Sequence, residues 1–255
     1  MNLNLKDNIA LITASSSGIG YAIGKAFLDE GANLILNGRN SEKLKRVVET
    51  LKVEYQNRNI LGFSGDLSIK RNVHDLKIFL QENNIPQIDH LILNLGTGKK
   101  NGTDLDVNEW NRSFDINLFG AVTVLNELME IVTSSIIFIS SIAGIRVINA
   151  PYAYSASKLA ILSLAKRLAV DCAPKGLRVN TVIPGNIYFE GGRWSEIIAE
   201  DPNVIENYIK KETPLGRFGK PEEIANTVVF LCSKKSSYTT GASIIIDGGQ
   251  SKEIR

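Results

Sequence analysis

The sequence has little cysteine. Its 255 residues include only Cys172 and Cys232, which are far apart and lie in no Cys-x-x-Cys or histidine-rich neighbourhood. This spacing is typical neither of a metal site nor of a disulfide framework. We therefore expect no bound metal, and we expect both thiols to be buried as small apolar side chains.

The chain also lacks a large charge of either sign. Its net charge is +2, and its basic runs are no longer than Lys99-Lys100 and Lys210-Lys211. A nucleic-acid partner requires a basic patch or stripe, so none is expected here.

Long apolar runs are missing as well. No stretch approaches the roughly 20 apolar residues of a membrane span. Residues Met1–Asp7 contain no basic region leading into an apolar one, as a cleaved signal would. The sequence therefore predicts a cytoplasmic protein without a membrane partner.

What the sequence does contain is a regular alternation of two patterns. Short runs rich in Ile, Val and Leu alternate with amphipathic segments, as in parallel strands covered by helices on both faces. The expected strands are Ile9–Thr13, Asn33–Asn37, Ile60–Ser64, His90–Leu95, Ser135–Ser140, Arg178–Ile183 and Ser243–Ile246. The expected helices are Ile19–Glu30, Ser41–Tyr55, Ile69–Glu82, Val107–Ile131, Tyr152–Cys172 and Pro221–Ser233. The fold class is α/β: a Rossmann-type, three-layer, doubly wound parallel sheet of seven strands.

The alternation continues along the whole chain without a linker, a repeat or a low-complexity tract, so residues 1–255 are expected to form one domain. One long stretch, from Asn186 to Gly219, has no clear strand, and such a stretch late in this fold is typical of a substrate lid. Its aromatic and apolar residues could line an apolar pocket or pack the lid onto the body, and Glu190 and Arg193 could serve a polar substrate. These aromatic and apolar residues are Tyr188, Phe189, Trp194, Ile197, Ile198 and Tyr208.

The first expected strand runs into a turn of small residues, Thr13 to Gly20, and then into a helix. Glycines there let backbone N–H groups approach a pyrophosphate, whose charge the helix N-terminus also favours. Small residues also make ordinary tight turns, but the place between first strand and first helix favours dinucleotide binding.

The end of the second expected strand bears on which dinucleotide binds. An acidic residue there would accept hydrogen bonds from ribose hydroxyls, but this chain has Asn37-Gly38-Arg39 instead. A guanidinium can pair with a 2′-phosphate, so we expect NADP(H) as the cofactor, with NAD(H) as the alternative. Arg39 could instead be an ordinary solvated residue at the start of the next helix. Asp66, followed by Leu67, could contact the adenine amino group or cap the next helix.

Tyr154 and Lys158 are the candidates for proton transfer. They are four residues apart in an expected helix and so share one face. A phenol is a weak acid at neutral pH, and a nearby ammonium would lower its pKa. Tyr152 is followed four residues later by Ala156 and is not a candidate. A Tyr-x-x-x-Lys pair alone usually means a packed tyrosine beside a surface lysine, so the context decides.

That context includes Ser141, at the end of the fifth expected strand. Its hydroxyl could donate to a substrate oxygen in the same crevice, and the alternative is an ordinary turn or cap serine.

Together these residues resemble the classical short-chain dehydrogenase/reductase family, from about Lys6 to Gln250. The family's motifs occur in order, and the run from Pro214 to Asp247 is similar to the ketoacyl-carrier-protein reductase and sugar dehydrogenase branches. The matching segments are Thr13 to Gly20, Leu93-Asn94-Leu95-Gly96, Asn117, Ser141, Tyr154 with Lys158, Pro184-Gly185, and Asp247-Gly248-Gly249.

The resemblance implies roles. Tyr154 would transfer the proton, Ser141 would hold the carbonyl oxygen, and Asn117 would hold a water in the proton relay. Lys158 would bind the nicotinamide ribose and lower the tyrosine pKa. The cofactor residues implied are Thr13, Ser15, Ser16, Ser17, Gly18, Ile19, Gly20, Arg39, Asp66, Leu67, Asn94, Gly96, Tyr154, Lys158, Pro184, Gly185 and Ile187. Family members are commonly tetramers, so a homotetramer or homodimer is expected.

The chain departs from the family pattern at a few positions. Ala14 replaces a glycine, which is tolerated at negative φ and strained at positive φ. Leu93 and Leu95 replace Asn and Ala, and Phe189 replaces a threonine that contacts the carboxamide.

The sequence therefore predicts an NADP(H)-dependent oxidoreductase that transfers a hydride between nicotinamide and a small-molecule carbonyl or alcohol, as a ketone or 3-oxoacyl reductase. The alternative within this class is an NAD(P)-dependent sugar or other secondary-alcohol dehydrogenase. The alternative of another class is a non-catalytic dinucleotide-binding or sensing protein.

Overall fold

A computed structural model describes residues 3–99, 102–200 and 202–252 and shows one parallel sheet of seven strands. The strand order is β3-β2-β1-β4-β5-β6-β7, and every neighbouring pair is parallel. The order reverses direction between β1 and β4, which is where doubly wound sheets open a crevice. The predicted fold class is confirmed. The strands are β1 (Ile9–Ile12), β2 (Asn33–Gly38), β3 (Ile60–Ser64), β4 (Ile88–Leu93), β5 (Val132–Ile139), β6 (Arg178–Pro184) and β7 (Ser243–Ile246).

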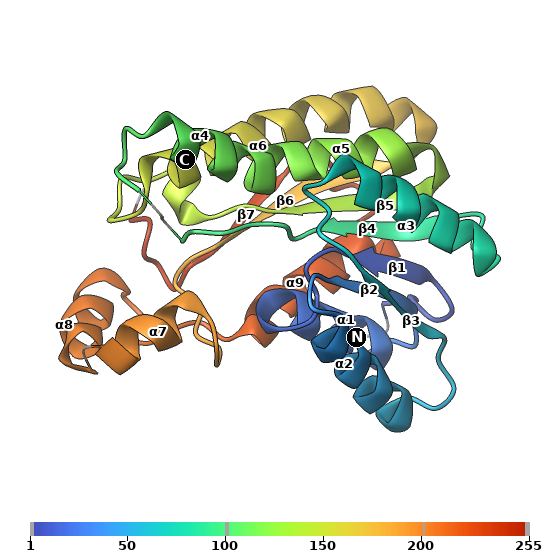
Figure 1. Ribbon diagram of the computed structural model, residues 1–255, viewed down its shortest axis with the longest axis horizontal. Coiled ribbons are helices and arrows are strands. Elements are labelled where there is room, and N and C mark those ends of the chain that lie inside the picture. The colour runs from blue at the N-terminus through green and yellow to red at the C-terminus, as the bar shows by residue number, and fades with distance from the viewer. Residues whose placement is uncertain (1–2, 100–101, 201, 253–255) are drawn as a thin grey trace.

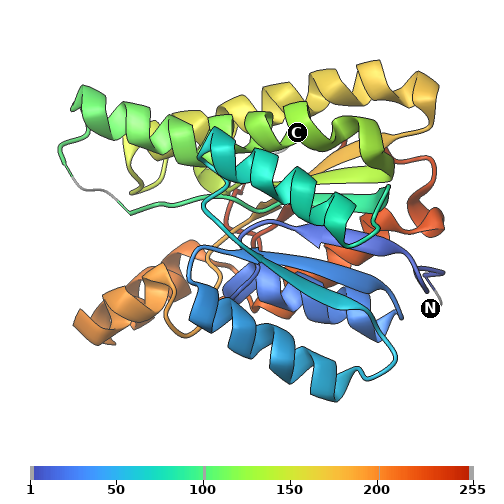
Figure 2. The same ribbon diagram turned by 45° about the vertical axis from the view of Figure 1, so that its right-hand side comes forward.

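Helices cover both faces of the sheet, giving three layers (Figures 1 and 2). Helices α1, α2 and α9 lie on one face and α3 to α6 on the other, while α7 and α8 project from the body at one end. Their bounds are α1 (Gly18–Asp29), α2 (Ser41–Glu54), α3 (Lys70–Glu82), α4 (Val107–Phe114), α5 (Gly120–Leu128), α6 (Tyr152–Cys172), α7 (Arg193–Glu200), α8 (Pro202–Glu212) and α9 (Pro221–Cys232).

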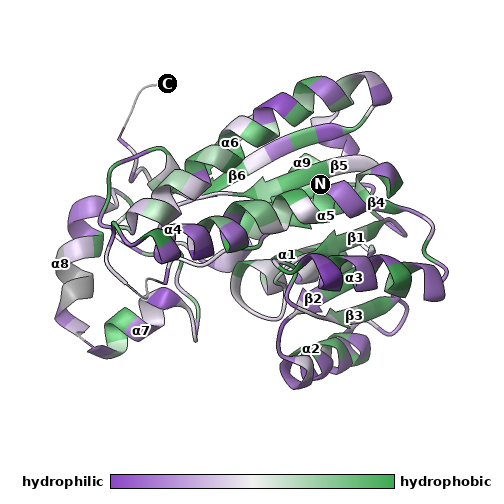
Figure 3. Ribbon diagram, turned by 45° about the horizontal axis from the view of Figure 1, so that its top comes forward, coloured by the Kyte–Doolittle hydropathy of each residue, from purple (hydrophilic) through white to green (hydrophobic). Residues whose placement is uncertain are grey.

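The strands are apolar on both faces because each face is buried, as Figure 3 shows by the hydrophobic colour along the central sheet. Successive residues point to opposite faces, so Ile12 joins the apolar cluster beneath α1 and α9, and Leu11 joins the cluster beneath α3, α5 and α6. Cys172 and Cys232 are free and buried, one in each cluster. The prediction of buried, unpaired thiols is confirmed.

The predicted single helix Val107–Ile131 is wrong in one respect. The backbone stays helical, but a π-helical turn, Asp115–Phe119, separates α4 from α5, and Met129–Ile131 is 3₁₀. A π-turn admits one extra residue, which side-chain periodicity does not reveal. The strand ends also shift: β4 spans Ile88–Leu93, and β5 begins at Val132 because Val132 pairs with Ile88.

His90 in β4 is fully buried in the body of the sheet. Its Nδ1 lies 2.9 Å from the Ser135 hydroxyl, and its Nε2 lies 2.9 Å from Nδ2 of Asn8. The ring stacks on Phe27 with 5.6 Å between centroids. Burial lowers the pKa of His90 from 6.5 to about 4; Asp89 has a smaller raising effect and Arg178 a smaller lowering effect.

Acid should therefore destabilise the fold through His90. The folded state keeps this imidazole neutral, so its contribution is complete above pH 6.5 and is lost as the pH falls from 6.5 toward 4. The free energy of unfolding should fall by about 2–3 kcal/mol more in the wild type than in a His90→Gln variant between pH 7.5 and 4.5. Urea unfolding measures this, with His74→Gln, at an exposed position, as the control. Equal pH slopes for the wild type and His90→Gln would contradict it.

Candidate active site

A cavity of about 550 Å³ lies at the carboxyl ends of the strands. In a parallel sheet these ends share one edge, so turns that are distant in sequence meet there. The predicted site residues that line the cavity are Ser16, Ser17, Ile19, Arg39, Asp66, Leu67, Asn94, Gly96, Tyr154, Lys158 and Ile187. The predicted residues outside this lining are Thr13, Ser15, Gly18, Gly20, Asn117, Ser141, Pro184 and Gly185.

Several of these outer residues hold the first turn in place. The Thr13 hydroxyl accepts from the Asn94 amide N–H at 2.8 Å, and the Ser15 hydroxyl donates to the Ile12 carbonyl at 2.8 Å. A Cβ on Gly20 would lie 2.5 Å from the Ala14 carbonyl oxygen, so no other residue fits there without displacing the backbone. The turn is thus built from contacts that need small residues at fixed positions.

The first turn fits a dinucleotide phosphate. Helix α1 begins at Gly18, and its N-cap, Ser17, makes no side-chain hydrogen bond to the helix. The first N–H groups of a helix have no partners within it, and together with the helix dipole they favour an anion. Gly18 has φ +57, a backbone conformation that glycine adopts readily. Ser16 and Ser17 line the cavity at this point.

Ala14 has φ +49, so the strained case applies to this departure. The left-handed conformation costs an L-residue roughly 1–2 kcal/mol of conformational free energy relative to glycine.

Ala14→Gly should raise the free energy of unfolding by about 1 kcal/mol, because it relieves this strain. Urea unfolding measures the change. Ala26→Gly, inside α1, is the matched control and should lower the free energy of unfolding by a similar amount. A loss of stability in Ala14→Gly would show that φ at this position carries no strain.

At the end of β2, Arg39 is exposed and lies 3.9 Å from Asp66, measured from Nη1 to Oδ2. Oδ1 of Asp66 accepts from the amide and the hydroxyl of Ser68, at 3.0 and 2.7 Å. Asp66 therefore closes the turn before α3. The alternative that it caps that helix is wrong, because the N-cap is Ile69.

Tyr154 and Lys158 lie one turn apart at the start of α6, and both line the cavity. Lys158 is 4% exposed, and its Nζ donates to the carbonyls of Ile139 at 3.0 Å and Leu95 at 3.4 Å. The same Nζ lies 5.9 Å from the centroid of the Tyr154 ring. Tyr152, by contrast, is 59% exposed.

Ser141 has two contacts. Its side chain is hydrogen-bonded to the Tyr154 hydroxyl, and its Oγ accepts from the Ala143 amide at 3.2 Å, at the start of a 3₁₀ turn. The serine is thus both a turn residue and a neighbour of the phenol. This contact brings a second hydroxyl to the point where Tyr154 would meet a substrate.

The pKa of Tyr154 is shifted. Burial raises it above its usual value, and the hydrogen bond with Ser141 opposes this only in part. Burial also lowers the pKa of Lys158, to about 8. The causes of the tyrosine shift are burial and the Ser141 contact, so the lowering of the tyrosine pKa by Lys158 stays a prediction. The Lys158 ammonium itself is hydrogen-bonded to two carbonyls.

Asn117 lies in the π-turn and is fully buried. Its Oδ1 accepts from the Thr97 amide at 2.8 Å, and its Nδ2 donates to the Ser113 hydroxyl at 3.1 Å. A Cβ on Gly96 would lie 2.9 Å from Nζ of Lys158 and 3.0 Å from Oδ1 of Asn117. Because Gly96 has no side chain, these two groups can face the same strand end.

Leu93 and Leu95 belong to the apolar cluster beneath α3, α5 and α6, and Leu95 also lines the cavity. Phe189 has a larger effect on the site. Its ring lies so close to Gly18 and Gly192 that a Cβ on either glycine would come within 2.6 to 3.0 Å of ring carbons. The ring therefore bridges the first turn and the segment before α7.

Some lining residues had no sequence signal beyond their place after a strand, in an expected helix or in the expected lid. They are Thr97, Gly98, Lys99, Ile116, Gly191, Gly192 and Glu196. Trp194, an expected lid aromatic, lines the cavity too. The Trp194 ring also packs against Tyr208 and Phe218, with centroid distances of 5.4 and 5.1 Å. Trp194 therefore does both things expected of the lid aromatics: it lines the cavity, and it packs against other aromatic residues of the 186–219 segment.

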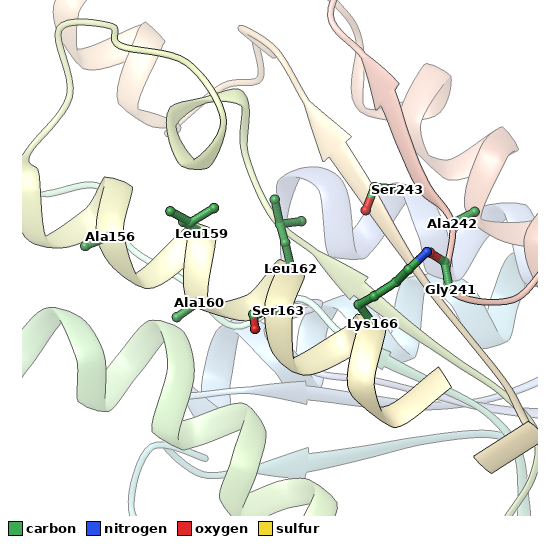
Figure 4. Close-up of a pocket in the computed structure, with 9 residues that line it drawn as sticks. All are labelled: Ala156, Leu159, Ala160, Leu162, Ser163, Lys166, Gly241, Ala242 and Ser243. Atoms are coloured by element: carbon green, nitrogen blue, oxygen red, sulfur yellow. The ribbon is translucent and has the colours of Figure 1, made fainter. Parts of the chain in front are cut away.

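A second, open groove of about 710 Å³ runs along α6 beside β7, away from Tyr154 (Figure 4). Small and apolar residues dominate its lining, and Nζ of its Lys166 donates to the Gly241 carbonyl at 2.9 Å. No acid, histidine or tyrosine is among its lining residues, so this larger groove is a poorer candidate for the chemistry.

Within residues 3–99, 102–200 and 202–252, no group of three or more His, Cys, Asp or Glu side chains could hold a metal ion. None of the helices in these ranges is long and apolar enough to cross a membrane.

Comparison with known proteins identifies relatives along nearly the whole chain. A family model described as enoyl-(acyl carrier protein) reductase matches residues 13–251. Dehydrogenase/reductase SDR family member 4 of Rattus norvegicus is 30% identical, over 96% of this chain and 88% of that protein. The 3-oxoacyl-[acyl-carrier-protein] reductase FabG of Aquifex aeolicus is 31% identical, over 98% and 99%. The crystal structure of L-sorbose reductase from Gluconobacter frateurii, complexed with NADPH and L-sorbose, superposes with a TM-score of 0.93 at 26% identity, over the full length of both chains.

Proposed function

The chain belongs to the short-chain dehydrogenase/reductase family, a family of oxidoreductases that act on alcohols and ketones, and we propose that it is an NADP(H)-dependent reductase of ketone or 3-oxoacyl substrates. One observation carries the proposal: Tyr154, hydrogen-bonded to Ser141 and one turn before Lys158, lines the same cavity as the phosphate-binding turn.

In the proposed mechanism, bound NADPH supplies the hydride to the carbonyl carbon. Tyr154 donates its phenolic proton to the carbonyl oxygen, and Ser141 holds that oxygen through its hydroxyl. The phenol is suited to act as the acid because burial raises its pKa and keeps it protonated. The Lys158 ammonium stabilises the phenolate left behind, and Asn117 fixes the segment that begins at Thr97.

The preference for NADP(H) is proposed from Arg39. Its guanidinium is 75% exposed at the side-chain level and stands at the end of β2, where the adenosine ribose would lie. Its ion pair with Asp66 is long, at 3.9 Å from Nη1, and leaves the other N–H groups of the guanidinium to pair with a 2′-phosphate through charge-assisted hydrogen bonds. Ser16 adds a hydroxyl beside Gly38, where a Cβ would lie 3.0 Å from its Oγ.

The test is a spectrophotometric screen of NADPH and NADH oxidation with ketones, 3-oxoacyl thioesters and ketoses. We expect the wild type to prefer NADPH. Arg39→Gln should lower the ratio of kcat/KM for NADPH to that for NADH by about tenfold or more, as loss of a charge-assisted pair predicts. The control is Arg46→Gln, at an exposed position of α2. A wild-type preference for NADH would overturn the argument from Arg39.

Two other functions have specific observations in their favour. A sugar or other secondary-alcohol dehydrogenase is supported by the likeness to L-sorbose reductase and by Arg193 and Glu196 in the cavity wall. A non-catalytic dinucleotide-binding protein is favoured by the departures from the family pattern at Ala14, Leu93 and Leu95, of which Ala14 has a positive φ. Tight NADPH binding without turnover of any carbonyl or alcohol would identify the second.

We further propose that residues 186–219, which include α7 and α8, form the substrate lid, and that the chain is a homodimer or homotetramer. Exposed apolar residues on the surface around α5 and α6 support the assembly, because a second copy could cover them: Phe119, Val122, Leu159 and Val170 are 51%, 40%, 55% and 63% exposed. Light scattering of the purified protein measures its mass in solution.

A further inference from the structure

Lys99 lines the cavity and has an unpaired ammonium group. The other exposed cations of the cavity wall face acids, Arg39 with Asp66 at 3.9 Å and Arg193 with Glu196 at 3.2 Å. Within the described part of the chain, Nζ of Lys99 has neither an ion pair nor a hydrogen bond. Its charge is therefore available to a ligand.

The segment that carries Lys99 passes directly beside the phenol. A Cβ on Gly98 would lie 3.8 Å from Cζ of Tyr154, the carbon that carries the hydroxyl. Lys99 is the next residue, so its side chain starts close to the place where the carbonyl oxygen of a substrate would meet Tyr154. A lysine side chain spans several ångströms, enough to reach a group near that carbonyl.

The backbone of Lys99 is held on both sides. Its N–H donates to the Thr97 hydroxyl at 3.2 Å, and the Thr97 amide is itself bonded to Asn117. Its carbonyl accepts from Nη2 of Arg112. Two hydrogen bonds, of 2.7 and 3.1 Å, fix Arg112 to Glu109, which is 5% exposed. An ion pair between the half-buried Arg112 and the buried Glu109 thus anchors the main chain, while no described residue pairs with the Lys99 ammonium.

These contacts leave a cationic group beside Tyr154. The acids that line the cavity, Asp66 and Glu196, are paired with Arg39 and Arg193 and do not face Lys99 in an ion pair. An unpaired lysine on a fixed backbone favours an anionic group through charge-assisted hydrogen bonds.

From this geometry we infer that the substrate carries an anionic group, a carboxylate or a phosphate, close to the reacting carbonyl, and that Lys99 binds it. The inference rests on the proposed reductase function and specifies its substrate class. Lys99 is thus a specificity-determining residue, and it takes no part in the proton transfer.

The experiment compares matched substrates that differ in charge. Acetoacetate is paired with methyl acetoacetate, and dihydroxyacetone phosphate with dihydroxyacetone, so that carboxylate and phosphate are distinguished. For each pair, the ratio of kcat/KM for the anion to that for the neutral compound is measured in the wild type, Lys99→Gln and Lys99→Arg. Lys235→Gln, at an exposed position after α9, is the control.

We expect a wild-type ratio above about ten for at least one pair and a fall of about tenfold in Lys99→Gln, as loss of one charge-assisted contact predicts. Lys99→Arg and Lys235→Gln should retain the ratio. A wild-type ratio near one for both pairs, or a ratio that Lys99→Gln leaves unchanged, overturns the inference.

If the proposed function is wrong, no carbonyl supports NADPH oxidation. Ligand binding then tests whether Lys99 binds an anionic group. Trp194 lines the cavity, so its fluorescence reports titration with acetoacetate and with its methyl ester. Acetoacetate binding that weakens about tenfold in Lys99→Gln supports the inference. Equal binding of acetoacetate by the wild type and Lys99→Gln overturns it.

Discussion

Tyr154→Phe should lower kcat for carbonyl reduction by about three orders of magnitude and leave NADPH affinity nearly unchanged. The substitution removes only the phenolic oxygen, which is the proposed proton donor and the partner of Ser141. The ring stays, so the Lys158 Nζ that lies 5.9 Å from its centroid keeps its neighbour. Initial rates of NADPH oxidation measure kcat, and quenching of tryptophan fluorescence measures the NADPH dissociation constant.

Tyr152→Phe is the matched control, because Tyr152 begins the same helix and is 59% exposed. It should keep wild-type turnover. A Tyr154→Phe enzyme with kcat within tenfold of the wild type would show that another group donates the proton. Water or a different side chain would then have to be sought in the cavity.

Lys158→Met should lower kcat by about 100-fold or more and alter the pH profile. Burial lowers the pKa of Lys158 to about 8, so the ammonium is charged below that pH and neutral above it. Reduction leaves a phenolate on Tyr154, which this charge stabilises. The wild-type reduction rate should therefore be full below pH 8 and fall as the pH rises through about 8. The variant should lack this inflection.

Lys166→Met, two turns further along α6, is the control and should keep the wild-type profile. The variant at Lys158 also leaves the carbonyls of Ile139 and Leu95 without their donor, at a cost of about 1–3 kcal/mol. Urea unfolding establishes that the variant is folded before its rates are compared. An inflection near pH 8 that persists in Lys158→Met would assign it to another group.

Much of the fold could be predicted because its signals are local. Strands buried on both faces are continuous apolar runs, and β3 and β7 have the predicted bounds Ile60–Ser64 and Ser243–Ile246. Residues four apart on a helix share a face, so Tyr154 and Lys158 could be paired from the sequence.

The features that could not be predicted depend on contacts between segments that are distant in sequence. The π-turn at Asn117 accompanies hydrogen bonds with Thr97, and periodicity in one helix does not encode a partner in another loop. The place of Phe189 against Gly18 depends on how residues 186–219 return to the first turn. The positive φ of Ala14 depends on the turn between β1 and α1.

The sequence by itself determined the parallel α/β sheet, the turn of small residues between the first strand and the first helix, and Tyr154, Lys158 and Ser141 as candidates for the chemistry. Only the tertiary structure decided in which direction the pKa values of Tyr154 and Lys158 are shifted. Burial raises the pKa of Tyr154 and lowers that of Lys158, because desolvation and hydrogen bonding act on each group where the folded chain places it. The fold also placed Lys99 in the cavity wall, next to Gly98, which faces the Tyr154 phenol. None of the described residues pairs with the Lys99 ammonium.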